Sequence, residues 1–316
     1  MLSILFLGYS NLVKGRILPI LSKTPFRQVA IAKYEGQRWD DKVREFDYQI
    51  RRYESYDEGL DEFAGDVVYI STVNSSHYEY AKKALLKGSH VIIDKPATFT
   101  YAQCCDLVEI AKRNEKLVCE STVYLYHPQL TLIDNIFREN GDVPKLLTAH
   151  FSFPPFLPDN FRYRKELGGG ALMDTLPYAV SIGRYFFREF PADCHYQIHE
   201  VNDDGLDIEY SLLLEYAGGK SMIGHFGFNT EYINQITILG TYTNVIVNRI
   251  FTTPDTLENP IIADHRNERK IYQASCGNAF TCFFNEVADA LSRSTYDGLY
   301  DDMLYDARVK SMIINN

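Results

Sequence analysis

Five short apolar runs occupy the first 124 residues and alternate with segments of helical periodicity. The runs are SILFLGY, QVAIAKY, DVVYIST, HVIIDKP and LVCESTVY, each too short for a helix and rich in Val and Ile. The segments LVKGRILPILSKT, YEYAKKALLKG and YAQCCDLVEIAKRN between them carry the apolar residues of helices. Strands covered on both faces and linked by helices predict an α/β fold with a doubly wound parallel sheet.

The pattern changes after about residue 125 to long segments in which polar and apolar residues alternate. These segments are LLTAHFSF, DIEYSLLLEYAGGKSMIGHFGF and QITILGTYTNVIVNRIF, and Gly218-Gly219 predicts a hairpin turn inside the second. Helices are expected over PQLTLIDNIFREN, after Asp174 and over AFTCFFNEVADALSR. We therefore expect a dinucleotide-binding domain over residues 1–122 and an α+β domain over 123–316 with a large, open, mostly antiparallel sheet.

Composition narrows the class of partner. The net charge of −10 and pI of about 5.3 oppose binding to nucleic acid or to an acidic membrane. The six cysteines lack CxxC spacing, so neither a zinc site nor a disulfide framework is predicted, and no metal is expected. The apolar N-terminus lacks the basic region and cleavage site of a signal peptide, which favours a cytoplasmic protein.

A glycine follows the first predicted strand, where a doubly wound sheet binds a pyrophosphate. Gly8 opens this turn, but Ser10 and Val13 replace the later glycines of G-x-G-x-x-G, so the motif alone also fits an ordinary strand-to-helix turn. The candidate cofactor residues at this turn are Gly8, Ser10, Asn11 and Leu12.

The second predicted strand ends in a lysine. Lys33 stands where an acidic residue normally holds the ribose 2′-hydroxyl of NAD, with Tyr34 and Arg38 nearby. A lysine there would attract a 2′-phosphate, although a solvated lysine at a strand end is common. We therefore expect NADP(H) to be preferred, with NAD(H) possible.

Two further strands end in polar residues at the edge where open sheets bind ligands. Thr72, Asn74 and His77 follow the third strand, and Asp94 and Lys95 follow the fourth. All five are candidate cofactor residues. Pro96 directly after Lys95 would hold that side chain at the crevice.

Several of these motifs together resemble the Gfo/Idh/MocA family of nicotinamide-dependent oxidoreductases. They are the Gly8 turn, STVNSSHYEYAKKAL, VIIDKP, YLYHPQ and GGGALMD followed by Tyr178, and they cover nearly the whole chain. VIIDKP is similar to the E-K-P motif of the family, whose lysine lies beside the nicotinamide and the substrate oxygen. The resemblance implies that Lys95 is catalytic and adds His127 of YLYHPQ as a substrate-binding candidate.

Tyr178 indicates a particular branch of this family. Many members place a histidine after the glycine-rich segment, whereas this chain resembles the members that use tyrosine as the acid. These include sugar-nucleotide ketoreductases, dihydrodiol dehydrogenases and some aldose dehydrogenases. FRYRKELGGGALMD looks most like the ketoreductases that act on nucleoside diphosphate hexoses, although Pro177 departs from the usual pattern.

The glycines at 168–170 would bring a backbone turn close to the substrate and lead into a helix. Asp174 and Tyr178 are four residues apart, so they share one face of that helix, and both are expected to point into a cleft between the domains. In the alternative interpretation Asp174 caps the helix and Tyr178 is a packed aromatic residue.

The implied reaction is hydride transfer between nicotinamide and a ketone or alcohol of a sugar. Tyr178 would supply the proton, and Lys95 would lower the tyrosine pKa from its ordinary value of about 10 and stabilise the oxyanion. Arg162 and Arg164 would bind a diphosphate, Tyr163 would stack on a base or sugar, and Asp174 would contact the substrate. Oxidation of a free aldose or diol, and a non-catalytic dinucleotide sensor, are the alternatives. The resemblance also implies a homodimer or homotetramer formed through the second sheet.

Overall fold

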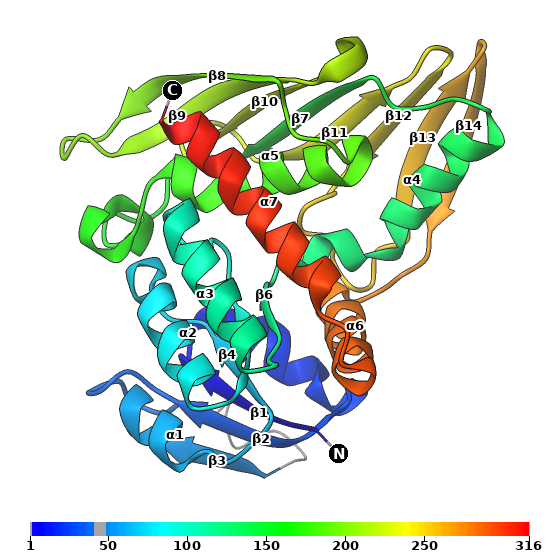
Figure 1. Ribbon diagram of the computed structural model, residues 1–316. Helices are drawn as coiled ribbons and strands as arrows, with labels where there is room; N and C mark the ends of the chain where they lie inside the picture. The colour runs from blue at the N-terminus through cyan, green and yellow to red at the C-terminus, as the bar shows by residue number, and fades with distance from the viewer. Residues whose placement is uncertain (1, 41–48, 316) are drawn as a thin grey trace. The chain divides into compact units, whose positions relative to one another are not determined.

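The structure is a computed structural model that describes residues 2–40 and 49–315, which form two compact units (Figure 1). The first unit is Met1–Ser121 with Phe280–Ala307, and the second is Thr122–Ala279 with Arg308–Asn316. The sequence assigned residues 280–307 to the second domain, but in the structure they group with the first unit. The reason is their apolar face, which completes the core of that unit.

The first unit contains, within the described residues, a six-stranded parallel sheet in the order β3-β2-β1-β4-β5-β6. Its strands are β1 (Leu2–Leu7), β2 (Phe26–Ala32), β3 (Ile50–Tyr53), β4 (Val67–Ile70), β5 (His90–Ile93) and β6 (Val118–Glu120). This order is that of a Rossmann sheet, so the predicted α/β class is confirmed. Strand β3 was not predicted, because it is a short edge strand that exposes Arg51 and Arg52 instead of an apolar run.

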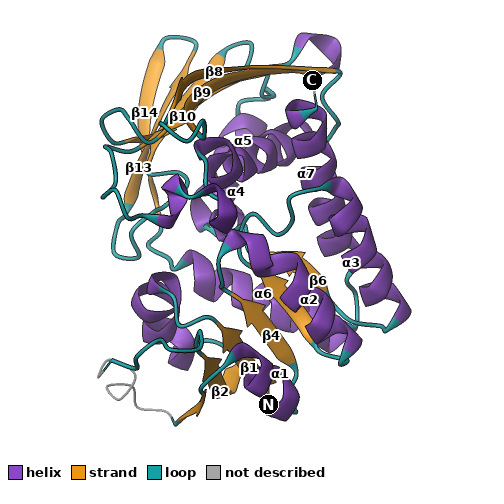
Figure 2. Ribbon diagram, turned by 90° about the vertical axis from the view of Figure 1, so that its left-hand side faces the viewer, coloured by secondary structure: helices purple, strands orange, loops and turns teal. Residues whose placement is uncertain are grey.

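Helices cover both faces of this sheet (Figure 2). They are α1 (Tyr56–Glu62), α2 (His77–Leu86), α3 (Tyr101–Arg113), α6 (Ala279–Arg293) and the first part of α7 (Asp297–Ile314). Phe284 of α6 packs edge to face against Phe26 of β2, with 5.5 Å between the ring centroids. Tyr300 and Met303 of α7 join the same buried cluster as Leu107 of α3. These contacts explain why the C-terminal helices belong to the N-terminal unit.

The helix predicted after β1 is present but irregular. It is a π-helix over Val13–Ile17 and a 3₁₀-helix over Leu18–Lys23. Pro19 lies inside this segment, cannot donate a backbone hydrogen bond and would clash with the carbonyl four residues earlier in a regular helix.

The second unit contains an eight-stranded sheet, counted over the part of the chain that the structure describes, in the order β14-β13-β12-β11-β7-β10-β9-β8. Its strands are β7 (Leu146–Ser152), β8 (Asp193–Val201), β9 (Asp207–Glu215), β10 (Ser221–Gly227), β11 (Ile233–Leu239), β12 (Thr243–Asn248), β13 (Asn259–His265) and β14 (Glu268–Ala274). All pairings are antiparallel except the one between β7 and β10. Gly218 and Gly219 form the predicted β9–β10 turn, with φ of 69° and 73°.

Helices α4 (Pro128–Glu139) and α5 (Ala171–Phe187) pack on one face of this second sheet (Figure 1). Its other face is open and alternates apolar with polar side chains, so that Ile223 is 48% exposed and Ile271 is 61% exposed. Strands β8, β13 and β14 and helix α7 were not predicted, since their patterns are short or strongly polar.

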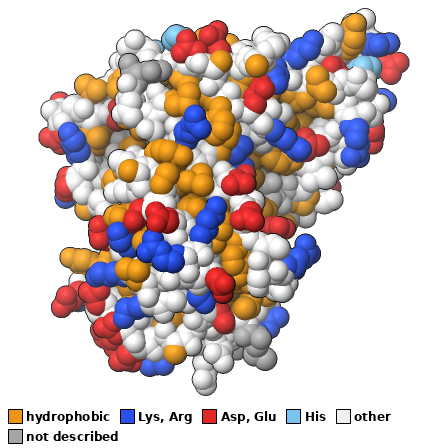
Figure 3. Space-filling model, viewed as in Figure 1, with side chains coloured by type: hydrophobic (Ala, Val, Ile, Leu, Met, Phe, Trp, Pro, Cys, Tyr) orange, Lys and Arg blue, Asp and Glu red, His pale blue; other side chains and the backbone are white. Residues whose placement is uncertain are grey.

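Among residues 2–40 and 49–315, no helix is long and apolar enough to cross a lipid bilayer. The face shown in Figure 3 carries basic side chains interspersed among acidic ones, in keeping with the net charge of −10. A ligand anion would therefore have to find a local group of cations.

Candidate active site

Lys95 is the second residue after strand β5, and Asp94 between them ties three strand ends together. The Asp94 carboxylate accepts hydrogen bonds from Ser71 Oγ at 3.3 Å and from Ser121 Oγ at 3.2 Å, and its Oδ1 also accepts the Lys95 N–H at 3.1 Å. Ser71 follows β4 and Ser121 follows β6. The start of the Lys95 loop is thus fixed to both neighbouring strands.

Two buried side chains hold the other end of this loop. The Nδ1 atom of His77 lies 2.9 Å from the Pro96 carbonyl oxygen, and its Nε2 lies 3.2 Å from the Thr72 carbonyl oxygen. The Ala97 N–H donates to Glu120 Oε2 at 2.7 Å, and the Lys95–Pro96 peptide is cis. His77 and Asp94, predicted as cofactor contacts, therefore support the loop that carries Lys95.

The Asp94 carboxyl group is electrostatically unusual. Burial raises its pKa above the ordinary value, while the charges of His77 and Lys95 and the hydrogen bond from Ser121 act in the opposite direction. The support of Lys95 is therefore polar and sensitive to the ionisation of one carboxyl group.

The turn after β1 is compact because glycine is required there. Gly8 has φ of 118°, and a Cβ on it would lie 2.1 Å from the Ser71 carbonyl oxygen. Ser10 Oγ accepts the Val13 N–H at 3.1 Å and lies 2.9 Å from Ser71 Oγ, so this turn connects to the Asp94 network. The next two residues are Asn11, which is exposed, and Leu12, which is half-buried. This tight backbone turn at a helix start fits a pyrophosphate group.

The turn after β4 carries the remaining predicted polar residues of this edge. Thr72 Oγ1 accepts a hydrogen bond from Ser76 Oγ at 2.7 Å. Asn74 is buried and begins the short 3₁₀ turn that leads into α2. Thr72 and Asn74 therefore lie with Lys95 and Gly8 at the carboxyl edge of the parallel sheet.

Lys33, the predicted phosphate ligand, has a partner of its own. Its Nζ lies 2.8 Å from Glu54 Oε2, and its side chain is only 6% exposed. Tyr34 and Arg38, predicted with it, are exposed. The positive charge of Lys33 is therefore already balanced by an acidic residue that directly follows β3, a strand that the sequence pattern does not reveal.

In the second unit, the glycines at 168–170 are needed because other groups approach the backbone closely. A Cβ on Gly169 would lie 2.5 Å from the Arg162 carbonyl oxygen. Gly170 has φ of 107°, and a Cβ on it would lie 2.8 Å from Asp207 Oδ1. The glycines thus let the chain turn tightly into helix α5, which begins at Ala171.

The start of helix α5 is capped by Asp207, a residue of strand β9. Gly170, at the N-cap position, has no side chain, and the Leu172 N–H donates to Asp207 Oδ2 instead. Asp207 lies on β9, 35 residues further along the chain, so no local pattern could have indicated it. Burial raises the Asp207 pKa, opposed by hydrogen bonds from backbone N–H groups at the start of the helix.

Tyr178 lies in the middle of α5 and is surrounded by aromatic rings. Its ring centroid is 4.9 Å from that of Phe151, 5.2 Å from Phe251 and 5.7 Å from Tyr124. The Tyr124 hydroxyl also donates to the Tyr178 carbonyl oxygen at 3.2 Å. The helix continues through Pro177, so the departure from the usual pattern does not break it.

Asp174 forms an ion pair with Arg162. Arg162 Nε donates to Asp174 Oδ2 at 2.9 Å. The guanidinium carbon of Arg162 lies 5.1 Å from the centre of the Phe156 ring and 4.8 Å from that of Phe161. Two residues predicted to bind substrate are therefore bound to each other, within a group of aromatic rings.

The remaining predicted substrate residues lie in different surroundings. The Tyr163 hydroxyl accepts the Phe156 N–H at 2.9 Å and so supports the loop before α5, while Arg164 is exposed. His127 is 1% exposed, and its Nδ1 accepts the Gln129 N–H at 3.2 Å and caps α4. Burial lowers the His127 pKa. The structure shows that His127 caps α4, and its role in substrate binding remains a prediction.

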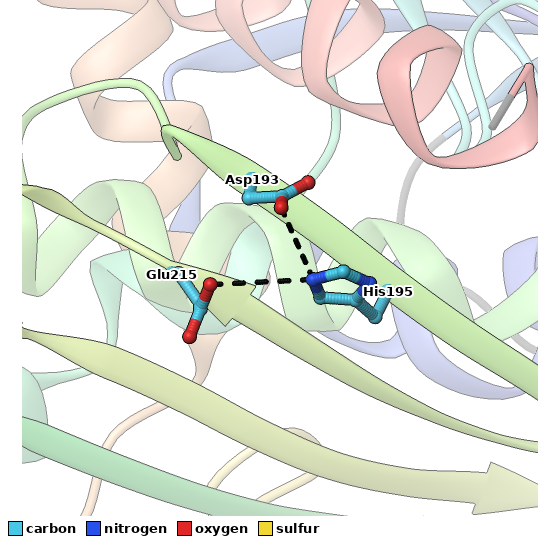
Figure 4. Close-up of side chains that lie close together, drawn as sticks. All are labelled: Asp193, His195 and Glu215. Atoms are coloured by element: carbon cyan, nitrogen blue, oxygen red, sulfur yellow. Dashed lines mark ion pairs between the residues drawn. The ribbon is translucent and has the colours of Figure 1, made fainter.

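One group of side chains in the described part of the chain has the spacing of metal ligands (Figure 4). His195 Nε2 lies 3.2 Å from Asp193 Oδ2 and 4.0 Å from Glu215 Oε2. All three residues are exposed on β8 and β9, and none belongs to the candidate residues above. Exposed acidic groups beside a histidine are common without an ion, so this group does not indicate metal-dependent chemistry.

Two protein-family models match separate parts of the chain. Residues 2–122 match an oxidoreductase family with an NAD-binding Rossmann fold, and residues 139–245 match the GFO/IDH/MocA C-terminal domain. The fold is also that of KijD10, a 3-ketoreductase from Actinomadura kijaniata solved in complex with NADP and TDP-benzene. The TM-score is 0.89 at 24% identity, covering 99% of this chain and 97% of that one.

Several similar sequences share one activity name, while others are named as a D-xylose 1-dehydrogenase and a trans-1,2-dihydrobenzene-1,2-diol dehydrogenase. The dTDP-3,4-didehydro-2,6-dideoxy-alpha-D-glucose 3-reductase of Saccharopolyspora spinosa is 32% identical over 191 residues, which are 60% of this chain and 57% of that enzyme. The enzyme of the same name from Actinomadura kijaniata is 27% identical over 270 residues, which are 83% and 79% of the two chains. The first alignment thus spans less than two thirds of its relative.

Proposed function

We propose, because the chain belongs to the Gfo/Idh/MocA oxidoreductase family, that it reduces a ketone on the sugar of a nucleoside diphosphate sugar, with NADP(H) as cofactor. The observation that carries this proposal is the Lys95 loop, which is fixed on both sides at the carboxyl edge of a Rossmann sheet. An ammonium carried by a loop whose backbone is fixed in this way is suited to orient a carbonyl oxygen. The names of the similar reductases support the substrate class.

In this proposal the residues at the carboxyl edge of the first sheet hold the cofactor. The backbone at Gly8, Ser10 and Asn11 would bind the pyrophosphate, and Thr72 and Asn74 would line the path toward the nicotinamide. When bound, the nicotinamide supplies or accepts the hydride. The chain itself then has to orient the ketone and move one proton.

Tyr178 and Lys95 divide this work. The Tyr178 hydroxyl donates a proton to the ketone oxygen as the alcohol forms, and in the reverse direction it accepts that proton. The Lys95 ammonium stabilises the negative charge that develops on the same oxygen. The aromatic rings around Tyr178 restrict its motion and thereby favour one orientation of the hydroxyl.

The loop before α5 would recognise the rest of the substrate. Arg164 is exposed and available to a diphosphate. Arg162 is paired with Asp174, so it would bind an anion either beside this carboxylate or in exchange for it. Tyr163 offers a half-buried ring for stacking on a base or sugar.

Turnover with a panel of substrates tests this function. The full chain is mixed with NADPH and either dTDP-linked 3-keto sugars, free keto sugars or simple ketones, and loss of NADPH absorbance is followed; D-xylose and a trans-dihydrodiol are tried with NADP⁺. Reduction of the dTDP-linked substrates at the highest kcat/KM supports the proposal. Faster oxidation of the aldose or diol would replace it with a dehydrogenase, and cofactor binding without any turnover would indicate a sensor.

We further propose that the chain self-associates through the open face of the second sheet. Ile246, Ile262 and Ile271 are cross-strand neighbours on β12, β13 and β14, and Ile223 and Ile233 add exposed apolar area on β10 and β11. Water-exposed apolar residues in a row are costly for a monomer. Light scattering at micromolar concentration should give a dimer or tetramer, and a monomer would contradict the proposal.

A further inference from the structure

Lys33 and Glu54 are the residues that follow two neighbouring parallel strands. Ala32 of β2 pairs with Tyr53 of β3, so Lys33 and Glu54 come next at the carboxyl ends of the two strands. In a doubly wound sheet, the end of the second strand lies beside the adenosine ribose of a bound dinucleotide. Glu54 therefore stands next to the position that distinguishes a 2′-hydroxyl from a 2′-phosphate.

Within the part of the chain that the structure describes, Glu54 is the polar partner of the Lys33 ammonium group. Its Nζ lies 2.8 Å from Glu54 Oε2 and 3.4 Å from the Glu54 carbonyl oxygen. The lysine side chain is 6% exposed, whereas the Glu54 side chain is 69% exposed. A buried ammonium is costly without a partner, so Lys33 depends on Glu54 for its charge balance.

The other carboxylate oxygen of Glu54 has a donor too. Trp39 Nε1 donates to Glu54 Oε1 at 2.9 Å. The guanidinium carbon of Arg52 lies 5.9 Å from the centre of the Trp39 ring. An ionised carboxylate can accept about four hydrogen bonds. Lys33 and Trp39 therefore orient Glu54 and leave room for a ligand hydroxyl on its exposed side.

We propose that Glu54 sets the selectivity between NAD(H) and NADP(H), accepting a hydrogen bond from the ribose 2′-hydroxyl and opposing a 2′-phosphate. A phosphate monoester carries nearly two negative charges, which would meet this carboxylate and would have to draw Lys33 away from it. Glu54 thereby weakens the NADP(H) preference that Lys33 alone would produce. This inference rests on the proposed function, because it requires that the chain binds a nicotinamide dinucleotide.

Glu54→Gln tests the inference in the full chain. Glutamine keeps an oxygen that can accept from Lys33 or Trp39 and removes only the charge. Trp39 is the sole tryptophan of the sequence, so its fluorescence reports binding directly beside the substituted residue. Dissociation constants are measured for NADPH and NADH, and for 2′,5′-ADP and 5′-AMP, which isolate the adenosine end. The ratio of NADH to NADPH dissociation constants should rise by about tenfold in the variant, since a like-charge contact is removed.

Glu62→Gln is the matched control. Glu62 is also an exposed carboxylate of the first unit and pairs with a cation, Arg51, at 2.8 Å, so the change in net charge is the same. The control should leave the ratio unchanged. A ratio in Glu54→Gln within about twofold of the wild type, with both cofactors still bound, overturns this inference alone. Absence of binding of either cofactor to the wild-type chain overturns the proposed function, and the inference with it.

A second variant covers the case in which Glu54→Gln unfolds. Glu54→Asp keeps the charge but shortens the side chain, so the carboxylate withdraws from both Lys33 and Trp39. The ratio of NADH to NADPH dissociation constants should then rise above the wild-type value, but by less than is expected when the charge is removed. A ratio that moves toward NADH in Glu54→Asp contradicts the inference, because it would mean that the carboxylate does not oppose the phosphate from its present position.

Discussion

Lys95 and Tyr178 are held in place by opposite kinds of interaction. The Lys95 loop is fixed by directional hydrogen bonds between its backbone and polar side chains, which belong to Asp94, His77 and Glu120. Tyr178 is held by the faces and edges of aromatic rings, and its backbone carbonyl accepts hydrogen bonds from Tyr124 and Ser181. The first arrangement depends on charge and donor geometry, and the second depends on shape.

Because of this difference, the two regions should tolerate different substitutions. Hydrogen bonds to buried groups lose most of their value when one partner is removed, because the other partner is left unsatisfied. Aromatic packing loses contact area gradually, since a smaller apolar side chain still excludes water. The surroundings of Lys95 should therefore be sensitive to pH and to single polar changes, and those of Tyr178 to volume.

The largest expected effect comes from removing the two reacting side chains. Lys95→Ala and Tyr178→Phe should each lower kcat by about a hundredfold or more while leaving the NADPH dissociation constant nearly unchanged. Steady-state kinetics and fluorescence titration measure the two quantities. The double variant should be little worse than either single one, because groups that act as a unit lose most of their effect at the first deletion.

Strict additivity in log kcat would instead show that Lys95 and Tyr178 act independently. Near-normal turnover of Tyr178→Phe with a reactive keto sugar would mean that the tyrosine is only a packed residue. In that case His127 would be the next acid to test, although it is buried and caps α4.

A second prediction concerns the turn into α5. Gly170→Ala should lower the free energy of unfolding by about 2 to 3 kcal/mol, because the new Cβ meets Asp207 and the positive φ is strained. Gly218→Ala is the matched control, since Gly218 also has positive φ but a Cβ there would meet nothing within 4 Å. The control should cost about 1 kcal/mol. Equal losses in urea denaturation would show that Asp207 does not matter for this turn.

A third, smaller effect is expected in the aromatic group. Phe251→Leu should lower the free energy of unfolding by about 1 to 2 kcal/mol and kcat by less than about tenfold, because the Tyr178 ring loses one neighbour. Phe283→Leu, a buried phenylalanine of α6, should cost similar stability with kcat unchanged. If both variants lowered kcat equally, the effect would reflect stability and not the position of Tyr178.

Most of the fold followed from local patterns. The five buried strands of the first sheet were predicted because each is a continuous apolar run, and helix α5 because it follows the glycines. The family resemblance, read from the Lys95 and Tyr178 motifs, is confirmed. The edge strand β3 was missed because Arg51 and Arg52 interrupt its apolar residues.

The parts of the site that were missed are those built by contacts between distant segments. Asp207 and Glu54 both act on residues that lie far away in the chain, and neither stands in a recognisable motif. Glu120 was missed although it could have been predicted from the sequence. It ends β6 at the same sheet edge as Asp94, where polar residues at strand ends are candidates for the site. Lys33 was found, but its partner could not be read from the sequence.

The smallest expected effect is on the pH dependence of the free energy of unfolding, which should differ between the polar surroundings of Lys95 and the aromatic surroundings of Tyr178. Burial raises the Asp94 pKa, so the folded chain binds this proton more tightly than the unfolded chain does. The stability that this carboxyl group contributes is then fully present below the unfolded-state pKa of about 4 and is lost as pH rises through the raised folded-state pKa. Asp94→Asn cannot titrate. The free energy of unfolding of the variant minus that of the wild type should therefore increase with pH over that window, as measured by urea denaturation.

Phe251→Leu provides the contrast for this last measurement, because no titratable group is changed and its difference from the wild type should stay constant with pH. The two curves must be compared over the same range, from about pH 4 to pH 8, so that the unfolded chain contributes equally to both. A flat difference for Asp94→Asn would mean that the hydrogen bonds from Ser71, Ser121 and the Lys95 backbone offset the burial of the carboxylate completely. The Lys95 loop would then be as indifferent to pH as the aromatic surroundings of Tyr178, and the contrast between the two regions would fail.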